Sequence, residues 1–289
     1  MVAHAIQTAV RPATQADTQQ LANLIHFEQY VHRHLDWRPP LEWIGHAPYL
    51  VAERRNNIIA TLACPPDPPN VAWIRLFAVG SGYSPQMAWE ELWPEALRVL
   101  SSSSPAIITA AIPLQNWFRS LLEMSDFRQT HKVVVLAWQA GTKAAPVNKS
   151  DVVIRPMNLD DLASVERVDM AAFGSVWQNT RSCLELAYRQ AAIATVAEVE
   201  SELVGYQIST ATTLGGHLAR LAVLPLYQGQ GIGYAILHDM LAQFERRGAN
   251  HLTVNTQHDN LTSLSLYQKA GFRRTGEEYP VFQYPTLLS

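Results

Sequence analysis

The sequence predicts an α/β fold that is built twice along the chain, and three observations support this prediction. An apolar run over residues 218–223 leads through a glycine-rich segment into an amphipathic segment over 234–247, which is the order strand, loop, helix. Short motifs of the second half also occur in the first half at a nearly constant spacing. Apolar residues make up 48% of the 289 residues, so the chain can bury the core of one large domain or of two ordinary ones.

The repeat is carried by four separated motifs. They are VRP at 10–12 and IRP at 154–156 (154 − 10 = 144), VAE at 51–53 and 196–198 (196 − 51 = 145), RLFAV at 75–79 and ARLAV at 219–223 (219 − 75 = 144), and LLEMSDF at 121–127 and LYQKAGF at 266–272 (266 − 121 = 145). A constant offset over four motifs predicts two copies of one fold. Residues 139–150 are small and polar and lack periodicity, which predicts a linker. We therefore expect domains at 1–145 and 151–289 that can be separated cleanly at this linker.

Each copy is expected to begin with a short strand that ends in Arg-Pro and is followed by a helix. Apolar residues at helical spacing predict this helix; they are Leu21, Leu24, Ile25, Val31 and Leu35 in the first copy, and Leu162, Val165, Val168 and Phe173 in the second. Asp17, and Asp160 or Asp161, are candidate N-caps. The pattern of the second copy then predicts a helix over 179–192 and strands over 194–199, 203–210 and 249–255.

The glycine-rich loop is a candidate phosphate site, because glycine lets an anion approach the backbone and a helix N-terminus offers unpaired N–H groups. A Walker loop would end in Gly-Lys-Ser/Thr, which this loop lacks. A dinucleotide-binding loop would read GxGxxG, with an acidic residue about 20 positions later. Here the spacing is GxGxG, and Thr253 and Val254 stand at that distance.

What remains, Gln-x-x-Gly-x-Gly over 228–233, resembles the pyrophosphate-binding motif of the GCN5-related N-acetyltransferase (GNAT) family. A second stretch, in which Asn260 precedes Tyr267 of an LYxxxGF motif, is similar to that family's other signature and follows in the expected order. The resemblance implies two tandem GNAT (acyl-CoA N-acyltransferase) domains, each with a mixed central sheet flanked by helices. In the first copy Met87 and Trp89 replace two of the glycines and Leu122 replaces Tyr267, so we expect a degenerate copy without a cofactor site.

The resemblance implies acetyl-CoA as co-substrate and a primary amine as acceptor, with direct attack of the amine on the thioester. The backbone of Leu221, Ala222 and Val223 would pair with the pantetheine arm, and the loop N–H groups would hold the pyrophosphate. Asn260 would contact the cofactor, cap its helix together with Ser263, or do both. The expected cofactor-binding residues are Leu221, Ala222, Val223, Gln228, Gly229, Gln230, Gly231, Ile232, Gly233, Tyr234, Asn260, Ser263 and Tyr267.

Tyr267 and His217 are the candidate catalytic residues. A phenol with a pKa of about 10 is protonated at neutral pH, so Tyr267 can supply the proton that the leaving thiolate needs; the alternative is a core aromatic. His217 is a candidate general base, because histidine titrates in a useful range. The alternative interpretation is that His217 is a surface histidine at the end of a strand. Asn255 stands where some relatives place a glutamate and cannot act as a base, while His258, Glu198 and a water chain are weaker candidates.

The acceptor pocket is expected to be formed by residues 173–181 and 278–284, and possibly by the first copy. A non-catalytic acyl-CoA sensor or scaffold, and aminoacyl transfer on the same fold, are the alternative functions; the glycine loop favours a CoA donor. The 25 acidic and 22 basic residues give a net charge of −3 without a basic block, so we expect no nucleic-acid partner. No apolar run is long enough to span a membrane, and two isolated cysteines predict neither a metal site nor a disulfide framework. We expect a cytoplasmic monomer or homodimer.

Overall fold

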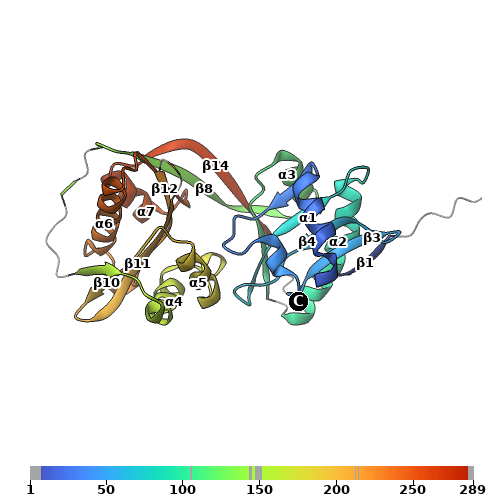
Figure 1. The fold of residues 1–289 in the computed structure, drawn as a ribbon, viewed down its shortest axis with the longest axis horizontal. Coiled ribbons are helices and arrows are strands. Elements are labelled where there is room, and N and C mark those ends of the chain that lie inside the picture. The colour runs from blue at the N-terminus through green and yellow to red at the C-terminus, as the bar shows by residue number, and fades with distance from the viewer. Residues whose placement is uncertain are drawn as a thin grey trace, which may run out of the picture. The chain divides into compact units, whose positions relative to one another are not determined.

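A computed structural model describes residues 8–104, 106–142, 145–146, 152–211, 213 and 215–285. They form two compact units, unit 1 with residues up to Thr130 together with the segment from Pro280, and unit 2 from His131 to Tyr279 (Figure 1). Each unit combines strands and helices, as the sequence predicts. Within the described residues, no helix is both long and apolar enough to cross a membrane.

Unit 2 contains one mixed sheet with helices on both faces. Its elements are β8 (Arg128–Gln139, of which residues 131–139 belong to this unit), β9 (Val153–Pro156), η3 (Leu159–Asp161), α4 (Leu162–Ala172), η4 (Ser175–Trp177), α5 (Arg181–Arg189), β10 (Ile193–Val199), β11 (Glu202–Ala211), β12 (Gly215–Val223), η5 (Pro225–Tyr227), α6 (Ile232–Arg246), β13 (His251–Gln257), α7 (Leu261–Lys269) and β14 (Arg273–Tyr284, residues 273–279). The strand order is β9-β10-β11-β12-β13-β8-β14, and β12 and β13 are a parallel pair.

The two faces of this sheet are covered by different helices (Figure 1). Residues of α6 and α7 share one apolar cluster with strand residues that include Leu218, Leu252 and Leu136. Helix α4 lies against β11 and β12, and its Asp169 receives a hydrogen bond from Tyr206 of β11. Because side chains alternate along a strand, these contacts define an α6/α7 face and an α4 face for every strand of the unit.

Unit 1 repeats the same order of elements. They are β1 (Ala9–Pro12), η1 (Gln15–Asp17), α1 (Thr18–Phe27), β2 (Tyr30–Arg33), η2 (Pro40–Trp43), β3 (Tyr49–Arg54), β4 (Asn57–Ala63), β5 (Val71–Trp73), β6 (Leu76–Val79), α2 (Pro85–Ser103), β7 (Ile108–Ala111) and α3 (Asn116–Glu123). The strands pair in the orders β1-β3-β4-β6-β2 and β5-β7-β14, the last through residues 282–284. Strands β9 and β1 begin 144 positions apart (153 − 9 = 144), and β14 and β8 begin 145 apart (273 − 128 = 145), so the predicted repeat is confirmed; the units differ at β2, where unit 2 has η4, and at β5 and β6, where unit 2 has the single strand β12.

The matched residues of the repeat form the same ion-pair network in both units. Arg11 binds Asp17 and Glu53 at 2.8 and 2.6 Å, and Arg155 binds Asp161 at 2.7 Å. The same arginine also binds Glu198 at 2.6 Å, which removes that residue as a candidate base. Asp17 and Asp161 stand at the N-cap positions of α1 and α4, as predicted, but their side chains make no cap hydrogen bond to these helices and bind arginine instead.

The compact units differ from the predicted domain boundaries in two segments. Residues 133–139 of β8, from the first sequence repeat, pair with β13 in unit 2, and Phe282 of β14 lies in the apolar core of unit 1. Gln139 ends β8, and the backbone N–H of Ala140 donates to the carbonyl of Asn250, so the predicted linker begins as ordered structure. Residues 143–144 and 147–150 of that linker lie outside the described residues. The expected clean cut at 150 is wrong, because it would remove a strand of unit 2.

The first helix is shorter than its apolar spacing predicts. Helix α1 ends at Phe27, and the predicted positions Val31 and Leu35 lie beyond it, the first in strand β2 and the second exposed. Strand β2 pairs antiparallel with β6, which the helical periodicity could not indicate because that partner is more than 40 positions away. Because this unpredicted strand covers one edge of β6, it determines whether unit 1 can bind a ligand there.

Candidate functional site

The glycine loop joins the end of β12 to the start of α6 and exposes a row of backbone donors. Gly229 and Gly231 have φ values of +76° and +86°, which non-glycine residues rarely adopt, and a Cβ at either would meet no atom within 4 Å. None of the N–H groups of residues 229–234 has a hydrogen-bond acceptor among the described residues. The side chain of Gln228 donates to the carbonyl of Val223 at 2.9 Å and fixes the loop to the strand. The loop thus presents a row of free donors suited to an anion.

Two predicted loop residues use their side chains for support. Gln230 donates to the carbonyl of Leu226 at 3.1 Å. The buried Tyr234 donates its hydroxyl hydrogen to the carbonyl of Ala145, and the ammonium of Lys269 lies 4.3 Å from its ring centre. Only the backbone of these two residues is available to a ligand at the loop.

Next to this loop, strands β12 and β13 separate. Their parallel register runs from Gly215 opposite His251 to Leu218 opposite Val254, and there the pairing ends. Residues 219–223 of β12 continue with β11 on one edge only, and a bulge at the same point leaves Ala219 without a partner in either neighbouring strand. In the described chain the predicted positions Leu221, Ala222 and Val223 therefore have a free backbone edge. We call the point after Leu218 and Val254 the branch point.

Helix α7 brings the second motif to the branch point. The side chain of Asn260 accepts from the N–H of Ser263 at 3.1 Å, so the capping role that its sequence allowed is realised. Tyr267 is 5% exposed and lies in one apolar cluster with Leu218 and Val254, the last paired residues. Its hydroxyl has no hydrogen-bond partner among the described residues, and burial raises the pKa of this phenol above its usual value, which keeps it protonated.

His217 lies on the α4 face of β12, one residue before the branch point. Its Nδ1 is 2.8 Å from the hydroxyl oxygen of Thr253 on β13, and its Nε2 has no partner among the described residues. Burial lowers the pKa of His217, so the ring is neutral at pH 7 and can accept a proton. The side chain is half-buried, which contradicts the surface-histidine interpretation. Asn255, two positions after Thr253, shares the α4 face and is exposed.

The remaining candidates do not lie together with these groups. His258 is 47% exposed, 3.7 Å from Asp259, and stands at the rim beyond β13. Of the predicted segment 278–284, Glu278 pairs with Lys132 at 2.8 Å, whereas Phe282 and Tyr284 pack in unit 1. The role of this segment in the acceptor pocket stays a prediction; only its residues 278 and 279 belong to unit 2, because β14 passes from one unit into the other at residue 280.

A buried polar cluster that the sequence analysis missed holds the segment after α4. Asp169 is fully buried and binds the guanidinium of Arg220 at 2.6 Å, and its other oxygen accepts from the N–H of Asn179 at 2.8 Å. Arg220 also donates to the carbonyl of Trp177 and lies 3.8 Å from the ring centre of Phe173. Strand β12 thereby fixes the predicted acceptor segment 173–181. A charged residue directly after Val168 of the apolar helix stripe was the signal that could have revealed this cluster.

The corresponding positions of unit 1 are occupied by the chain itself. β6, the counterpart of residues 220–223, pairs with β4 on one edge and with β2 on the other. The carboxylate of Glu28 accepts from the N–H of Ser81 at 2.8 Å in the loop before α2, and Pro85 removes one N–H at the start of that helix. Trp89 lies in the unit 1 core and Met87 is 50% exposed.

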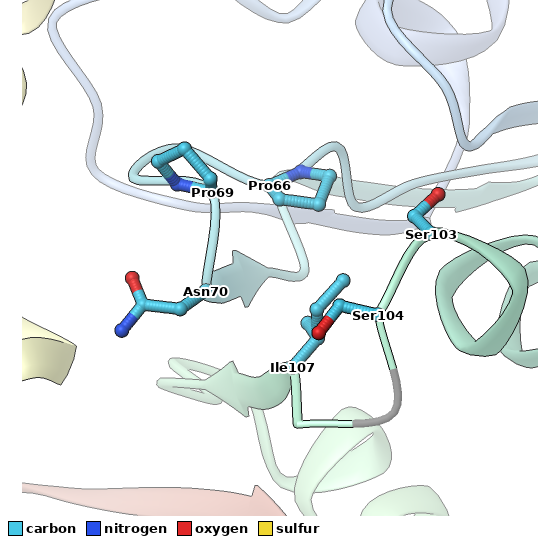
Figure 2. Close-up of a pocket in the computed structure, with 6 residues that line it drawn as sticks. All are labelled: Pro66, Pro69, Asn70, Ser103, Ser104 and Ile107. Atoms are coloured by element: carbon cyan, nitrogen blue, oxygen red, sulfur yellow. The ribbon is translucent and has the colours of Figure 1, made fainter.

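A surface pocket of unit 1 lies elsewhere (Figure 2). Its walls are the loop before β5 and the C-terminal end of α2, and they carry no ionisable side chain. The lining residues are Pro66, Pro69, Asn70, Ser103, Ser104 and Ile107. Because the counterpart of the glycine loop lies at the opposite end of α2, this pocket is not the counterpart of the candidate site.

Comparison with known proteins agrees with this geometry. Residues 162–281 match a family model described as an acetyltransferase (GNAT) domain. The chain is 38% identical over 63 residues to N-alpha-acetyltransferase 30 of Schizosaccharomyces pombe, which covers 22% of the chain and 42% of that protein. It is 24% identical over 128 residues to a putative [ribosomal protein bS18]-alanine N-acetyltransferase of Bacillus subtilis, covering 44% of the chain and 85% of that protein. The chain thus spans less than half of the first relative and most of the second.

Solved structures extend the likeness to both units. A GCN5-related N-acetyltransferase from Sphaerobacter thermophilus superposes with a TM-score of 0.60 at 17% identity, covering 97% of either chain. A tandem GNAT protein from the clavulanic acid biosynthesis pathway gives a TM-score of 0.62 at 14% identity, covering 96% of this chain and 98% of that one. The fold is that of tandem acyl-CoA N-acyltransferase domains. The match to the GNAT acetyltransferase model covers residues 162–281, which include the glycine loop and the Asn260–Tyr267 motif of the second unit.

Proposed function

We propose that unit 2 binds acetyl-CoA and transfers the acetyl group to the primary amine of a small molecule or peptide. The observation that carries this proposal is the edge of β12 over residues 219–223 that pairs with no strand, which lies between the free N–H groups of the glycine loop and the branch point; on this segment the carbonyl of Val223 accepts from Gln228. The loop N–H groups would bind the pyrophosphate, and the free edge of β12 would hydrogen-bond the amide groups of the pantetheine arm as it would another strand. The thioester would then lie at the branch point.

The groups around the branch point have complementary protonation states. Neutral His217 on the α4 face would accept the proton that the attacking ammonium loses. Tyr267, on the α6/α7 face, would donate its hydroxyl proton to the thiolate as the carbon–sulfur bond breaks and the amide bond forms. Acid and base would therefore flank the thioester from opposite faces of the sheet, with no covalent enzyme intermediate.

A binding-only role as an acyl-CoA sensor is the second candidate, and Asn255 favours it, because some relatives have a glutamate at this position. Two measurements separate the functions. Calorimetry with acetyl-CoA is expected to give one site per chain, and thiol release is then followed with a panel of amines. The panel includes peptides with an N-terminal alanine, since the Bacillus subtilis relative is named for that substrate. Binding without thiol release for any amine would favour the sensor, and no binding would overturn both.

A further inference from the structure

One edge of the branch point is built by a strand from the first sequence repeat. Within unit 2, β8 pairs with β13 from Gln139 opposite His251 to Val133 opposite Gln257. Beyond the end of β13, the N–H of His258 still donates to the carbonyl of Lys132 at 2.8 Å. The first residues of β8 in this unit therefore run along the open end of the separated strands.

The alternation of β8 assigns its side chains to the two faces. Val134, Leu136 and Trp138 lie in the apolar cluster with α6 and α7, so the odd-numbered residues face α4. His131 is one of these, and its ring makes an edge contact with Trp177, with ring centres 6.0 Å apart and planes at 86°. This is the edge-to-face geometry that aromatic rings favour.

Trp177 reaches this contact from the opposite side of the opening. Its carbonyl is held by Arg220 of β12, one residue after the bulge, and Arg220 is in turn held by buried Asp169. Trp177 is held by Arg220 of β12, and His131 lies on β8. The contact between their rings therefore spans the gap that β12 and β13 leave on the α4 face. Both rings are half-buried, so part of each surface is open to a ligand.

We propose that His131 and Trp177 form the wall that binds the acceptor, and that they select amines with an apolar substituent next to the amino group. The inference rests on the proposed function, because the glycine loop on the α6/α7 side would take the cofactor and leave the α4 face to the acceptor. Two aromatic rings offer a broad contact surface to such a substituent. His131 acts here as a specificity-determining residue that the first repeat supplies to the site in unit 2.

The test compares variants of the full chain, using acetyl-CoA and the best amine of the panel. His131→Ala and Trp177→Ala are expected to raise the acceptor KM about tenfold, because an aromatic contact and its buried area are worth about 1.4 kcal/mol. The Kd for acetyl-CoA is expected to stay within about twofold, since neither ring belongs to the loop or the β12 edge. His131→Phe keeps the ring and is expected to retain the wild-type KM.

His251→Ala is the matched control, because this exposed histidine lies at the opposite end of β13, and it is expected to leave both constants unchanged. Circular dichroism checks that each variant is folded. An unchanged acceptor KM in His131→Ala and Trp177→Ala would overturn the inference while leaving the proposed function intact. Loss of kcat in His131→Phe, together with loss of the acidic limb of the pH profile, would also overturn it by making His131 a base. A wild type that releases no thiol with any amine would overturn the proposed function and this inference with it.

Discussion

The two units differ in how they satisfy the backbone hydrogen-bonding groups of one sheet edge and the loop beside it. In unit 2 the strands separate after Leu218, and residues 219–223 keep an unpaired edge beside a glycine loop with free donors. In unit 1 the counterpart of β12 is broken into β5 and β6, and β2 pairs with the edge of β6. Glu28 supplies an anion to the loop of unit 1. The chain therefore occupies in unit 1 the positions that a cofactor would occupy in unit 2.

One scaffold can therefore form a binding site or a closed domain, depending on the conformation of a short segment. Residues 30–33 form β2, and the positions 144 further on, 174–177, hold the short helix η4 (Ser175–Trp177) and its N-cap instead. Unpaired backbone groups must be satisfied by water, by ligand or by protein. Unit 1 satisfies them internally, which removes the space for a ligand, whereas unit 2 leaves them to a ligand or solvent. Four experiments test this difference between the two units, in order of decreasing expected effect.

The largest effect is expected from removing β8 from unit 2. A fragment 131–279 keeps the strand that pairs with β13, whereas a fragment 151–279 loses it and exposes the apolar face around Leu252 and Val254. We expect the shorter fragment to aggregate, because an unpaired apolar edge promotes association, and the longer one to be more soluble. Size-exclusion chromatography compares them with the full chain. Equal, monomeric behaviour of both fragments would show that β8 is dispensable for unit 2.

The next effect concerns the loop that distinguishes the units. Gly231→Trp is expected to abolish acetyl-CoA binding in calorimetry, because a side chain would occupy the anion position. Gly82→Trp, in the loop before α2, is the matched control, since it has nearly the same φ of +84° and equally open surroundings. Both substitutions introduce backbone strain of about 1–2 kcal/mol. Binding that is lost in both variants, or in neither, would contradict the assignment of the cofactor to unit 2 alone.

Tyr267→Phe tests whether Tyr267 is the general acid of unit 2. The counterpart of Tyr267 in unit 1 is Leu122. The ring is kept and the proton donor is lost, so kcat is expected to fall by roughly 10²–10⁴-fold while the Kd for acetyl-CoA is unchanged. Tyr227→Phe, whose exposed hydroxyl binds Glu202, serves as the control and is expected to be neutral. Because burial raises the pKa of Tyr267, the wild type is expected to show no loss of kcat from this group up to pH 9. Full turnover of Tyr267→Phe with chemistry rate-limiting would exclude the residue as the acid.

The smallest effect is a loss of stability in acid that is expected to arise from a buried histidine of β2. His32 is fully buried, its Nε2 donates to the carbonyl of Ile74 at 3.1 Å, and burial lowers its pKa from 6.5 to about 4. Below pH 6.5 the unfolded chain binds a proton that the folded chain does not, so stability is expected to fall as the pH drops from 6.5 to 4. The full loss is about 3 kcal/mol.

Urea unfolding, followed at pH 7 and pH 4.5, measures this loss. His32→Gln, which does not titrate in this range, is expected to flatten the pH dependence of unit 1 unfolding. His26→Gln, at an exposed position of α1, is the control and is expected to leave the slope unchanged. The same pH dependence in His32→Gln and wild type would show that β2 is not the acid-sensitive element.

Local patterns predicted the repeat, the strand–loop–helix order and the glycine loop, because those features depend on residues close in the chain. They also indicated that Tyr267 and Asn260 share one helix. They did not reveal strand β2, since helical spacing over Leu24, Val31 and Leu35 competes with a partner far along the chain. They placed Asp17 at the N-cap of α1 but did not reveal its arginine partner, which is positioned by tertiary folding.

By itself, the sequence determined that the fold occurs twice and that only the second copy has the glycine loop. Both follow from motif order and from the steric freedom of glycine, which are local properties. Only the tertiary structure decided which strand edges are free, which unit each copy's last strand joins, and which rings face the branch point. Pairing in a sheet is a contact between distant segments, so Trp177 and His131 come together through the registers of β12, β13 and β8 and not through any spacing in the chain.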